Sequence, residues 1–380
     1  MVAPLHIVLL NYRDITHPEA GGAEIYLQEI FGRIAAHGHR VTLLCAKHGA
    51  APAEERIGQI RVLRVSGQAV VNVAAAVAAL RMARRERVDV FVESLCKLPF
   101  LLPAVTAIPV LPVVLHLFGD AVFRETNLAL GAYVWLFERL IPPVYRGLRF
   151  VALSDSTARD LISRGVRANR IDVIPPGLDL HSYPTNGSLP CAAEPLLVYV
   201  GRLKRYKGLD TVIRAFGRVC AVVSGAQLVL VGKGDDRPRL EKLVRALSLT
   251  ASIHFTGFVP EAEKIDWLRR ARAVVYPSPR EGWGIATLEA AACGTPVVAS
   301  DAEGLRDAVR DGSTGFLVPH ADVDAWAQRM TQLLTDSSVH HRMRAAARQW
   351  AQQFDWDVEA AKMRQIVEEV AAAGRAPRVR

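Results

Sequence analysis

The chain has few cysteines, and they form no closely spaced pair. Cys45, Cys96, Cys191, Cys220 and Cys293 are scattered over 380 residues, and no Cys-x-x-Cys occurs. A disulfide-rich secreted domain or a structural zinc site needs cysteines at short, regular spacings. Neither class of protein is indicated, and we expect free thiols in a reducing cytoplasm.

A block of basic residues is also absent. The chain carries 47 Lys and Arg against 38 Asp and Glu, a formal net charge of +9, and the excess is spread over both halves. A nucleic-acid-binding protein usually concentrates its charge on one face and carries a recognition motif. The sequence therefore argues against nucleic acid as a partner. The mild excess suits anionic small ligands or an anionic membrane surface.

No segment has the features of a signal peptide or of an unbroken membrane span. Residues 1–11 lack a basic start and a small-residue cleavage site. Residues 98–118 are apolar and about long enough to cross a bilayer, but Pro103, Pro109 and Pro112 are among their prolines. Prolines at this density would break a single helix. We expect short buried strands joined by turns here.

A dinucleotide-binding fingerprint is missing as well. Residues 5–10 are predicted to form a buried strand, but no Gly-x-Gly-x-x-Gly follows them. A dinucleotide-dependent dehydrogenase would need that motif after its first strand, with an acidic residue about 20 positions later. We therefore set this class of enzyme aside.

The chain does contain a regular alternation of apolar strands and amphipathic helices. Such a pattern predicts parallel sheets covered on both faces. One series occupies residues 1–185 and a second occupies residues 193–355, with a linker rich in proline, glycine and asparagine between them. Residues 356–380 are predicted to form a C-terminal helix that packs back on the N-terminal domain, and a frayed tail. The predicted fold class is α/β, with two Rossmann-like doubly wound domains facing across a deep cleft.

Two glutamates in one short run are the most informative feature. Seven residues separate Glu281 from Glu289, and the apolar spacing after Gly284 predicts a helix that ends near Gly294. If the whole run were helical, eight steps of ~1.5 Å would place the carboxylates roughly 12 Å apart. Two carboxylates that flank one glycosidic bond are roughly 5–9.5 Å apart. The spacing therefore suits two anchor points on a long, hydroxyl-rich ligand such as a nucleotide-sugar.

A basic loop offers contacts for the middle of such a ligand. Arg202 and Lys207 follow one predicted strand and precede a predicted helix. Ligands of parallel sheets bind at this edge, outside the carboxyl ends of the strands. Arginine can grip phosphate oxygens with two parallel hydrogen bonds, and lysine adds a point charge. We predict a diphosphate contact here; a solvated basic loop is the alternative.

Two glycine pairs give weaker signals. Gly21 and Gly22 open a predicted helix, where they would let an anion approach the helix N-terminus or would form a tight turn alone. Gly232 and Gly234 resemble a fragment of a phosphate loop, but the full motif is missing and a plain turn after a strand is favoured.

Two further features leave alternatives open. His116 ends an apolar run, where it could bind a donor sugar, steer a proton or serve as a structural histidine. Residues 128–150 mix aromatic and apolar side chains with arginines. This mixture fits an interfacial helix that touches a membrane, or the ordinary packing of an amphipathic helix.

Taken together, these residues resemble the family 4 retaining glycosyltransferases of the GT-B fold. Glu281 and Glu289 fit the family's E-x7-E motif, and the Gly-Arg and Lys-Gly pairs at Arg202 and Lys207 occur in the right order. The resemblance covers nearly the whole chain. One departure is Trp283, where the family usually has phenylalanine.

The resemblance implies a role for each candidate residue. The predicted catalytic residues are Glu281, His116, Arg202 and Lys207. The predicted donor-binding residues are Gly21, Gly22, Arg202, Lys207, Val259, Glu281, Gly282, Trp283, Gly284, Ile285, Ala286 and Glu289. Arg202, Lys207 and Gly22 would lie by the diphosphate. Glu281, the backbone after it and His116 would lie by the sugar. Glu289 would bind the ribose hydroxyls, and Val259 would lie near the nucleobase.

The resemblance also implies the reaction. The family transfers a sugar from a nucleotide-diphosphate sugar with retention of configuration and without an evident nucleophile, the leaving phosphate helping to deprotonate the acceptor. No Asp-x-Asp motif is present, and we expect neither a metal nor a cofactor. The expected acceptor is a glycan, a lipid-linked or a small-molecule hydroxyl. The expected location is cytoplasmic, with peripheral contact to the inner face of the membrane.

Two alternatives share this fold or its ligand. An epimerase or phosphorylase would process the same class of sugar nucleotide, but a phosphorylase should show a cofactor lysine and none can be placed. A non-catalytic binding protein would have lost Glu281 or Arg202, and both are present.

Overall fold

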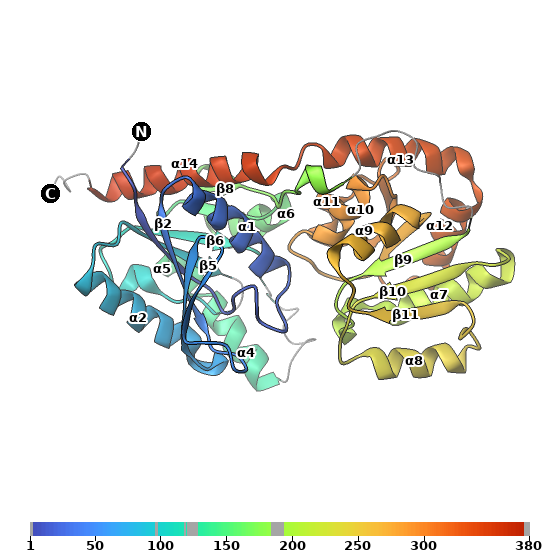
Figure 1. The fold of residues 1–380 in the computed structure, drawn as a ribbon, viewed down its shortest axis with the longest axis horizontal. Helices are drawn as coiled ribbons and strands as arrows, with labels where there is room; N and C mark the ends of the chain where they lie inside the picture. The colour runs from blue at the N-terminus through green and yellow to red at the C-terminus, as the bar shows by residue number, and fades with distance from the viewer. Residues whose placement is uncertain (1–2, 96–97, 118, 120–127, 184–193, 376–380) are drawn as a thin grey trace. The chain divides into compact units, whose positions relative to one another are not determined.

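The computed structural model describes residues 3–95, 98–117, 119, 128–183 and 194–375 (Figure 1). The chain divides into two compact units. Unit 1 comprises Met1–Gly177 and Trp356–Arg380, and unit 2 comprises Leu178–Asp355. Each unit is built on its own sheet, so each is described by itself.

The sheet of unit 1 runs in the order β3-β4-β2-β1-β5-β6-β7-β8. The pairings are parallel except for that of β3 with β4. Its strands are β1 (His6–Leu10), β2 (Arg40–Ala46), β3 (Glu54–Ile57), β4 (Ile60–Ser66), β5 (Val90–Leu95), β6 (Val110–Val114), β7 (Phe150–Ala152) and β8 (Ile171–Val173). The central strands β1, β5 and β6 are buried along their whole length, as expected for parallel strands covered on both faces.

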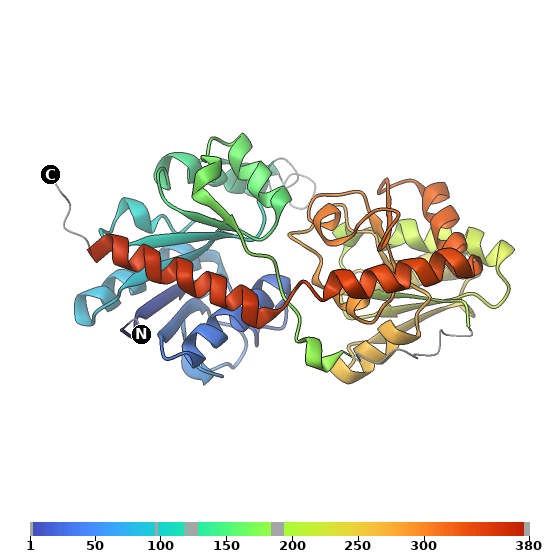
Figure 2. The ribbon, with the colours of Figure 1, turned by 90° about the horizontal axis from the view of Figure 1, so that it is seen from above.

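Helices cover both faces of this sheet. On one face, α1 (Gly22–Ala36) packs against α14 (Trp356–Arg375), which also contacts β5 and β6. On the other face lies α2 (Val71–Arg85), against β4 and β2 (Figure 1). The remaining α-helices described in this unit are α4 (Leu128–Glu138), α5 (Ile141–Val144) and α6 (Asp155–Ser163). Figure 2 shows α14 lying lengthwise across unit 1. The predicted packing of the C-terminal helix on the N-terminal domain is therefore confirmed.

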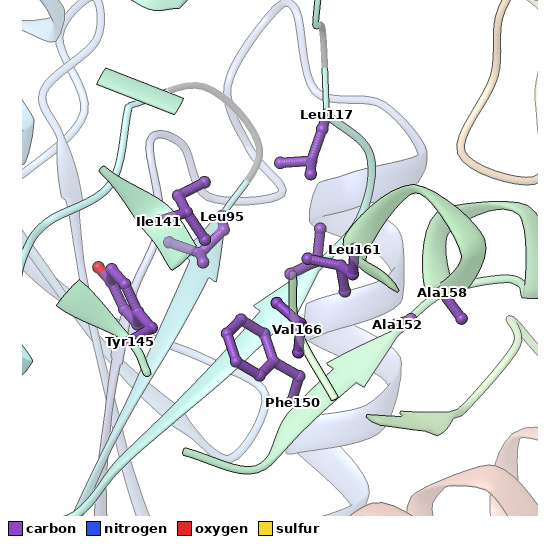
Figure 3. Close-up of a cluster of buried hydrophobic side chains, with 10 residues drawn as sticks. Leu95, Leu117, Ile141, Tyr145, Phe150, Ala152, Ala158, Leu161 and Val166 are labelled. Carbon is purple, nitrogen blue, oxygen red and sulfur yellow. The ribbon is translucent and has the colours of Figure 1, made fainter. Parts of the chain in front are cut away.

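A cluster of buried apolar side chains packs around β5, β6 and β7 of unit 1 (Figure 3). Leu95 of β5 and Phe150 of β7 meet Ile141 of α5, Tyr145 just beyond that helix and Leu161 of α6. Burying each such side chain contributes roughly 1.5–3 kcal/mol. The cluster fixes α5 and α6 on the sheet, although α5 is a single turn that could not be stable alone.

The sheet of unit 2 runs in the order β11-β10-β9-β12-β13-β14, and its pairings are parallel. Its strands are β9 (Leu196–Val200), β10 (Gln227–Val231), β11 (Ile253–Gly257), β12 (Ala273–Tyr276), β13 (Val297–Ser300) and β14 (Gly315–Val318). Its α-helices are α7 (Leu209–Val222), α8 (Arg237–Ala246), α9 (Glu261–Arg270), α10 (Ile285–Ala292), α11 (Leu305–Ala308), α12 (Val323–Thr335) and α13 (Ser337–Ala351). Helix α7 packs against α8 and α12, whereas α10 packs against α9 and α13.

The structure refines several predicted elements. The helical pattern of about residues 323–373 does not form one continuous helix: Asp336 ends α12 and caps α13 by accepting hydrogen bonds from the amides of Ser338 and Val339. Within residues 98–118, the described part forms a turn at Leu102–Ala104 and strand β6. Among the described residues, no helix has the length and apolar character needed to cross a membrane. Residues 184–193, which contain the predicted linker, lie outside the described chain.

Candidate functional site

Strand order reverses in unit 2 between β9 and β12. From β9 the chain moves outward to β10 and β11, and it then returns to place β12 on the other side of β9. Ligands of doubly wound sheets bind at such a reversal, outside the carboxyl ends of the strands. The loops that leave β9 and β12 carry Arg202, Lys207 and Glu281, so the topology brings the three predicted residues to one edge.

The loop after β9 has a shape fixed by its neighbours. The hydroxyl of Tyr199 donates to the carbonyl of Arg202 at 3.0 Å, and the guanidinium of Arg202 donates to the hydroxyl of Tyr206 at 3.1 Å. A Cβ at Gly234 would lie 1.9 Å from the carbonyl oxygen of Leu203, and a Cβ at Gly232 would lie 1.9 Å from that of Gly201. The two glycines of the loop after β10 thus permit close backbone packing.

Lys207 and Glu281 meet directly across the two loops. The Lys207 ammonium group donates to a carboxylate oxygen of Glu281, and both side chains are largely buried. The rings of Tyr206 and Tyr276 lie 5.1 and 5.5 Å from the Lys207 nitrogen. A cation between two aromatic faces is stabilised by their quadrupoles. Lys207 is therefore held in one place, with little freedom to be reoriented.

The backbone around Glu281 is held by the loop after β13. The amide of Glu281 donates to the carbonyl of Glu303 at 3.3 Å. A Cβ at Gly304 would lie 2.2 Å from the carbonyl oxygen of Glu281. Gly284 then takes a left-handed conformation with φ of 95° and caps α10. The helix begins only at Ile285, so the 12 Å separation calculated for an unbroken helix does not apply.

The first turn of α10 carries the amides of Ile285 and Ala286. Amides in the first turn of a helix have no intrahelical acceptor and favour an anion or a polar ligand group. Gly282 precedes them in the loop. These amides therefore lie on the same helix as Glu289, at its end next to the loop that carries Glu281.

Trp283 points its ring into packing rather than to the surface. It is buried, and its ring meets that of Phe354 edge-on at 5.4 Å; Phe354 in turn contacts Trp350 at 4.8 Å. The indole nitrogen is buried without a hydrogen-bond partner in the described structure. The side chain anchors the loop to α13 and its end, which is a packing role that phenylalanine could also fill.

Glu289 has a partner that the sequence did not reveal. The Nζ of Lys264, on α9, lies 2.8 Å from Glu289 Oε1. Burial raises the pKa of Glu289, an effect that Lys264 opposes. Burial alone would lower the pKa of Lys264, but the charges of Glu289 and Glu261 raise it. The two residues are 25 positions apart. Only the packing of α9 against α10 could have suggested the contact, and local spacing does not reveal it.

Val259 lies in the short loop between β11 and α9. Its side chain is buried, whereas the neighbouring Phe258 is exposed. The Nζ of Lys233 lies 5.7 Å from the centre of the Phe258 ring. The position predicted for the nucleobase is thus a short loop with one buried and one exposed apolar side chain.

Gly21, Gly22 and His116 belong to unit 1, whereas Arg202, Lys207, Glu281 and Glu289 belong to unit 2. Gly21 is the extended cap residue of α1, and its amide donates to Glu24 Oε2 at 2.8 Å. His116 is half-buried and lies two residues beyond the end of β6, rather than within the strand.

A buried ion pair anchors the loop that leads to Gly21. Asp14 accepts from Arg64 Nε at 2.8 Å and from the amide of Thr16 at 2.9 Å. Burial alone would raise the pKa of Asp14, but these hydrogen bonds lower it well below its usual value. The contact joins residues 50 positions apart, so no sequence pattern signalled it.

Comparison with known proteins identifies the chain. Residues 190–350 match the family described as glycosyl transferases group 1, and residues 20–182 match glycosyltransferase family 4. The chain belongs to the family 4 glycosyltransferases. The predicted family and its GT-B fold class, two Rossmann-like α/β domains, are confirmed.

The relatives of this chain include two kinds of curated protein. A D-inositol 3-phosphate glycosyltransferase from Xylanimonas cellulosilytica is 34% identical over 56% of this chain and 55% of its own length. A glycogen synthase from Mycobacterium tuberculosis is 34% identical over 52% of this chain and 48% of its own. The matched part spans about half the length of these relatives.

Solved structures share the fold over nearly the whole chain. Sucrose-phosphate synthase from Thermosynechococcus elongatus has a TM-score of 0.83 at 24% identity and covers 97% of this chain and all of its own. HepE from Anabaena, solved with UDP-glucose, has a TM-score of 0.74 at 20% identity and covers 97% of this chain and all of its own. At these identities the likeness shows the fold alone.

Proposed function

We propose that this chain is a retaining glycosyltransferase that moves a sugar from a nucleotide-diphosphate sugar to a hydroxyl acceptor. One observation carries the proposal: the contact of Lys207 with Glu281 at the strand-order reversal of unit 2, with Arg202 in the same loop. A cation suited to a phosphate and a carboxylate suited to sugar hydroxyls then lie side by side. The fold neighbour HepE was solved with UDP-glucose, which supports a donor of this class.

The proposed donor contacts follow the order of the elements. Arg202 and Lys207 bind the diphosphate, and Glu281 with the amides of Gly282 to Ala286 binds the sugar. Glu289 binds the ribose hydroxyls and Val259 lies by the base. From unit 1, Gly22 is assigned to the diphosphate and His116 to the transferring sugar.

The same residues would assist departure of the nucleoside diphosphate. Negative charge develops on the leaving phosphate as the sugar–oxygen bond breaks, and prepositioned cations stabilise it most when they need no reorganisation. Lys207, already held by Glu281 and two aromatic rings, meets that condition. The leaving phosphate then takes the proton of the acceptor hydroxyl on the same face of the sugar, which retains the anomeric configuration.

The reaction is proposed to need neither a metal nor a cofactor. Among the described residues, no group of three or more His, Cys, Asp or Glu side chains is arranged to hold a metal ion. Transfer should therefore continue after exhaustive treatment with EDTA. A loss that Mg²⁺ or Mn²⁺ restores would contradict this part of the proposal.

The acceptor side is proposed to involve a glycan or a lipid-linked hydroxyl at the inner membrane surface. Helix α4 of unit 1 exposes Leu128, Tyr133 and Leu136, and the guanidinium of Arg139 lies 3.6 Å from the Trp135 ring centre. Apolar and basic side chains together suit an anionic bilayer surface. Sedimentation with anionic vesicles should capture the protein, and Leu136→Glu should weaken the capture.

The decisive test is donor turnover. The purified chain is incubated with UDP-, GDP- and ADP-sugars, and release of nucleoside diphosphate is measured with and without acceptors. One donor should be hydrolysed or transferred, and Glu281→Ala should abolish this. Glu303→Gln is the matched control, because its side chain is half exposed and pairs with Arg280 instead. Unchanged turnover in Glu281→Ala would overturn the site, and conversion of the donor without diphosphate release would favour the epimerase alternative.

A further inference from the structure

Lys264 is a largely buried ion-pair partner of Glu289, the residue assigned to the donor ribose. Its Nζ lies 2.8 Å from Glu289 Oε1 and 2.8 Å from Glu261 Oε1. The side chains of Lys264 and Glu289 are 16% and 13% exposed, whereas that of Glu261 is 64% exposed. The contact with Glu289 is therefore shielded from water, and the contact with Glu261 is an ordinary surface pair of small energetic weight.

The other groups that face Glu289 do not offer a positive charge. The charge of Glu289 acts on three nearby groups. They are Tyr183, on the segment that enters unit 2, Tyr276 of β12, and Cys293 beyond the end of α10. Each of these groups would become negative on ionisation. Arg269 and Arg348 act on Cys293, but Lys264 is the cation that contacts Glu289.

A carboxylate that recognises a ribose must accept hydrogen bonds from two neighbouring hydroxyl groups. The ionised form has lone pairs for both, whereas the protonated form must use one oxygen as a donor. A buried carboxylate without a nearby cation takes up a proton more readily, because burial disfavours its charge. The charge and the position of Glu289 both depend on what occupies the place of Lys264.

We propose that Lys264 positions Glu289 and keeps it ionised, and so enables the site to prefer a ribose over a 2′-deoxyribose. This inference rests on the proposed function, because it assigns Glu289 to the donor ribose. Lys264 is a positioning residue: Oε1 of Glu289 meets the lysine, and the remaining lone pairs face the sugar hydroxyls.

Binding measurements at two pH values test the inference. The tightest ligand among UDP, GDP and ADP is titrated by calorimetry beside its 2′-deoxy form, at pH 6 and pH 9. The ratio of the two dissociation constants cancels the titration of the phosphate. Wild type should prefer the ribonucleotide by about 10-fold at both pH values, since hydrogen bonds to charged groups are strong. Lys264→Met should lose the preference at pH 6 and regain it at pH 9, where Glu289 ionises without help.

Three variants separate a positioning role from a merely structural one. Glu289→Gln should lose the preference at both pH values, since an amide does not titrate. Lys264→Arg should keep it, and Glu261→Gln should keep it because the exposed partner is not needed. If Lys264→Met does not fold, Lys264→Gln carries the test, since its amide can hydrogen-bond but brings no charge.

The outcomes distinguish this inference from the function on which it rests. If no nucleoside diphosphate binds the wild type, both are overturned. If one binds and Lys264→Met keeps the wild-type ratio at pH 6, or if Glu261→Gln loses it equally, the inference alone is overturned. A pH-independent loss in Lys264→Met would also overturn it, because that result would show a packing defect rather than a change in ionisation.

Discussion

Each glutamate of the Glu281–Glu289 run is held by a lysine from another element. Lys207, between β9 and α7, meets Glu281, and Lys264 of α9 meets Glu289. Both pairs are largely buried, and burying an ion pair costs desolvation energy that a hydrophobic pair would not. Arrangements of this kind are common where charge is used for binding or chemistry, which agrees with the donor site proposed here.

Arg202 is predicted to matter more for turnover than for binding. It would contact the leaving diphosphate, whose charge is greatest in the transition state. Arg202→Ala should lower kcat by roughly 100- to 1000-fold and raise the dissociation constant of the nucleotide much less. Steady-state kinetics and calorimetry on one preparation measure both quantities. Arg205→Ala, an exposed arginine of the same loop, should change neither, and an equal loss of binding and turnover in Arg202→Ala would contradict a leaving-group role.

At the scale of elements, glycines with positive φ set the positions of the loops. Gly208 caps α7 with φ of 70°, and a Cβ there would lie 2.4 Å from His320 Cε1 and 2.9 Å from the carbonyl oxygen of Pro277. Gly225 has φ of 72°, and nothing lies within 4 Å of a Cβ there. The two positions share a positive φ that disfavours a Cβ, and they differ in crowding.

This pair predicts a graded effect of alanine. Gly225→Ala should lower the free energy of unfolding by roughly 1–2 kcal/mol, the penalty of the left-handed conformation for a residue with a Cβ. Gly208→Ala should cost ~2 kcal/mol more from crowding and should weaken nucleotide binding, because Lys207 is the adjacent residue. Urea unfolding and calorimetric binding measure the two effects. Equal losses of stability at both positions would refute the role of crowding.

Strand β5 of unit 1 carries a fully buried glutamate. Glu93 accepts from the amide of Leu102 at 2.9 Å and contacts the hydroxyl of Tyr145. Burial raises its pKa from 4.5 to about 7, although the hydrogen bonds from Tyr145 and the backbone oppose the rise. Because the folded pKa is above the unfolded one, this group contributes stability below about pH 4.5 that is lost as pH rises through 7.

The contribution of Glu93 to the free energy of unfolding should change by about 3 kcal/mol between pH 4.5 and neutral pH. The change is measured as the difference in free energy of unfolding between wild type and Glu93→Gln at each pH, since other titrating groups contribute equally to both proteins. Chemical denaturation at several pH values between 5 and 8 measures it. The wild-type chain should lose stability relative to Glu93→Gln as pH rises, and a constant difference would contradict the shifted ionisation.

At the scale of the whole molecule, the chain crosses from unit 2 back to unit 1 at its end. The amide of Leu178 donates to the carbonyl of Phe354 at 3.1 Å, so both crossing segments pair within unit 2. Beyond that point, α14 buries Trp356, Met363 and Val367 in unit 1. The salt bridge from Arg375 to Asp89, at 2.6 Å, adds a contact near its C-terminal end.

Ending the chain after Asp355 should therefore destabilise one unit and spare the other. Three large buried side chains would be lost from unit 1, each contributing roughly 1.5–3 kcal/mol. The pairing of Leu178 with Phe354 would remain in unit 2. Differential scanning calorimetry should show one transition lowered or missing and a second unchanged. A uniform shift of both transitions would show that α14 stabilises the molecule as a whole.

Prediction from sequence succeeded where the pattern was local. Continuous apolar runs that end sharply at turn residues predict strands at Leu196–Val200, Gln227–Val231, Ala273–Tyr276 and Gly315–Val318, and these are the bounds of β9, β10, β12 and β14. The sequence pattern does not predict β3 and β8, since Glu54–Ile57 and Ile171–Val173 are short and partly polar. Helical periodicity predicts one helical tail over about residues 323–373, but side-chain capping by Asp336 divides it into separate helices. The roles of the site residues stay predictions.

The sequence by itself determined the alternation of strands and helices, the family, and the loops that carry Arg202, Lys207 and Glu281. These are properties of hydrophobic periodicity and of short motifs, which act over a few neighbouring residues. Only the tertiary structure decided that Lys207 meets Glu281, that Lys264 meets Glu289, and that Arg64 anchors Asp14. Such contacts depend on strand order and helix packing, which bring distant parts of the chain together and leave no trace in local spacing.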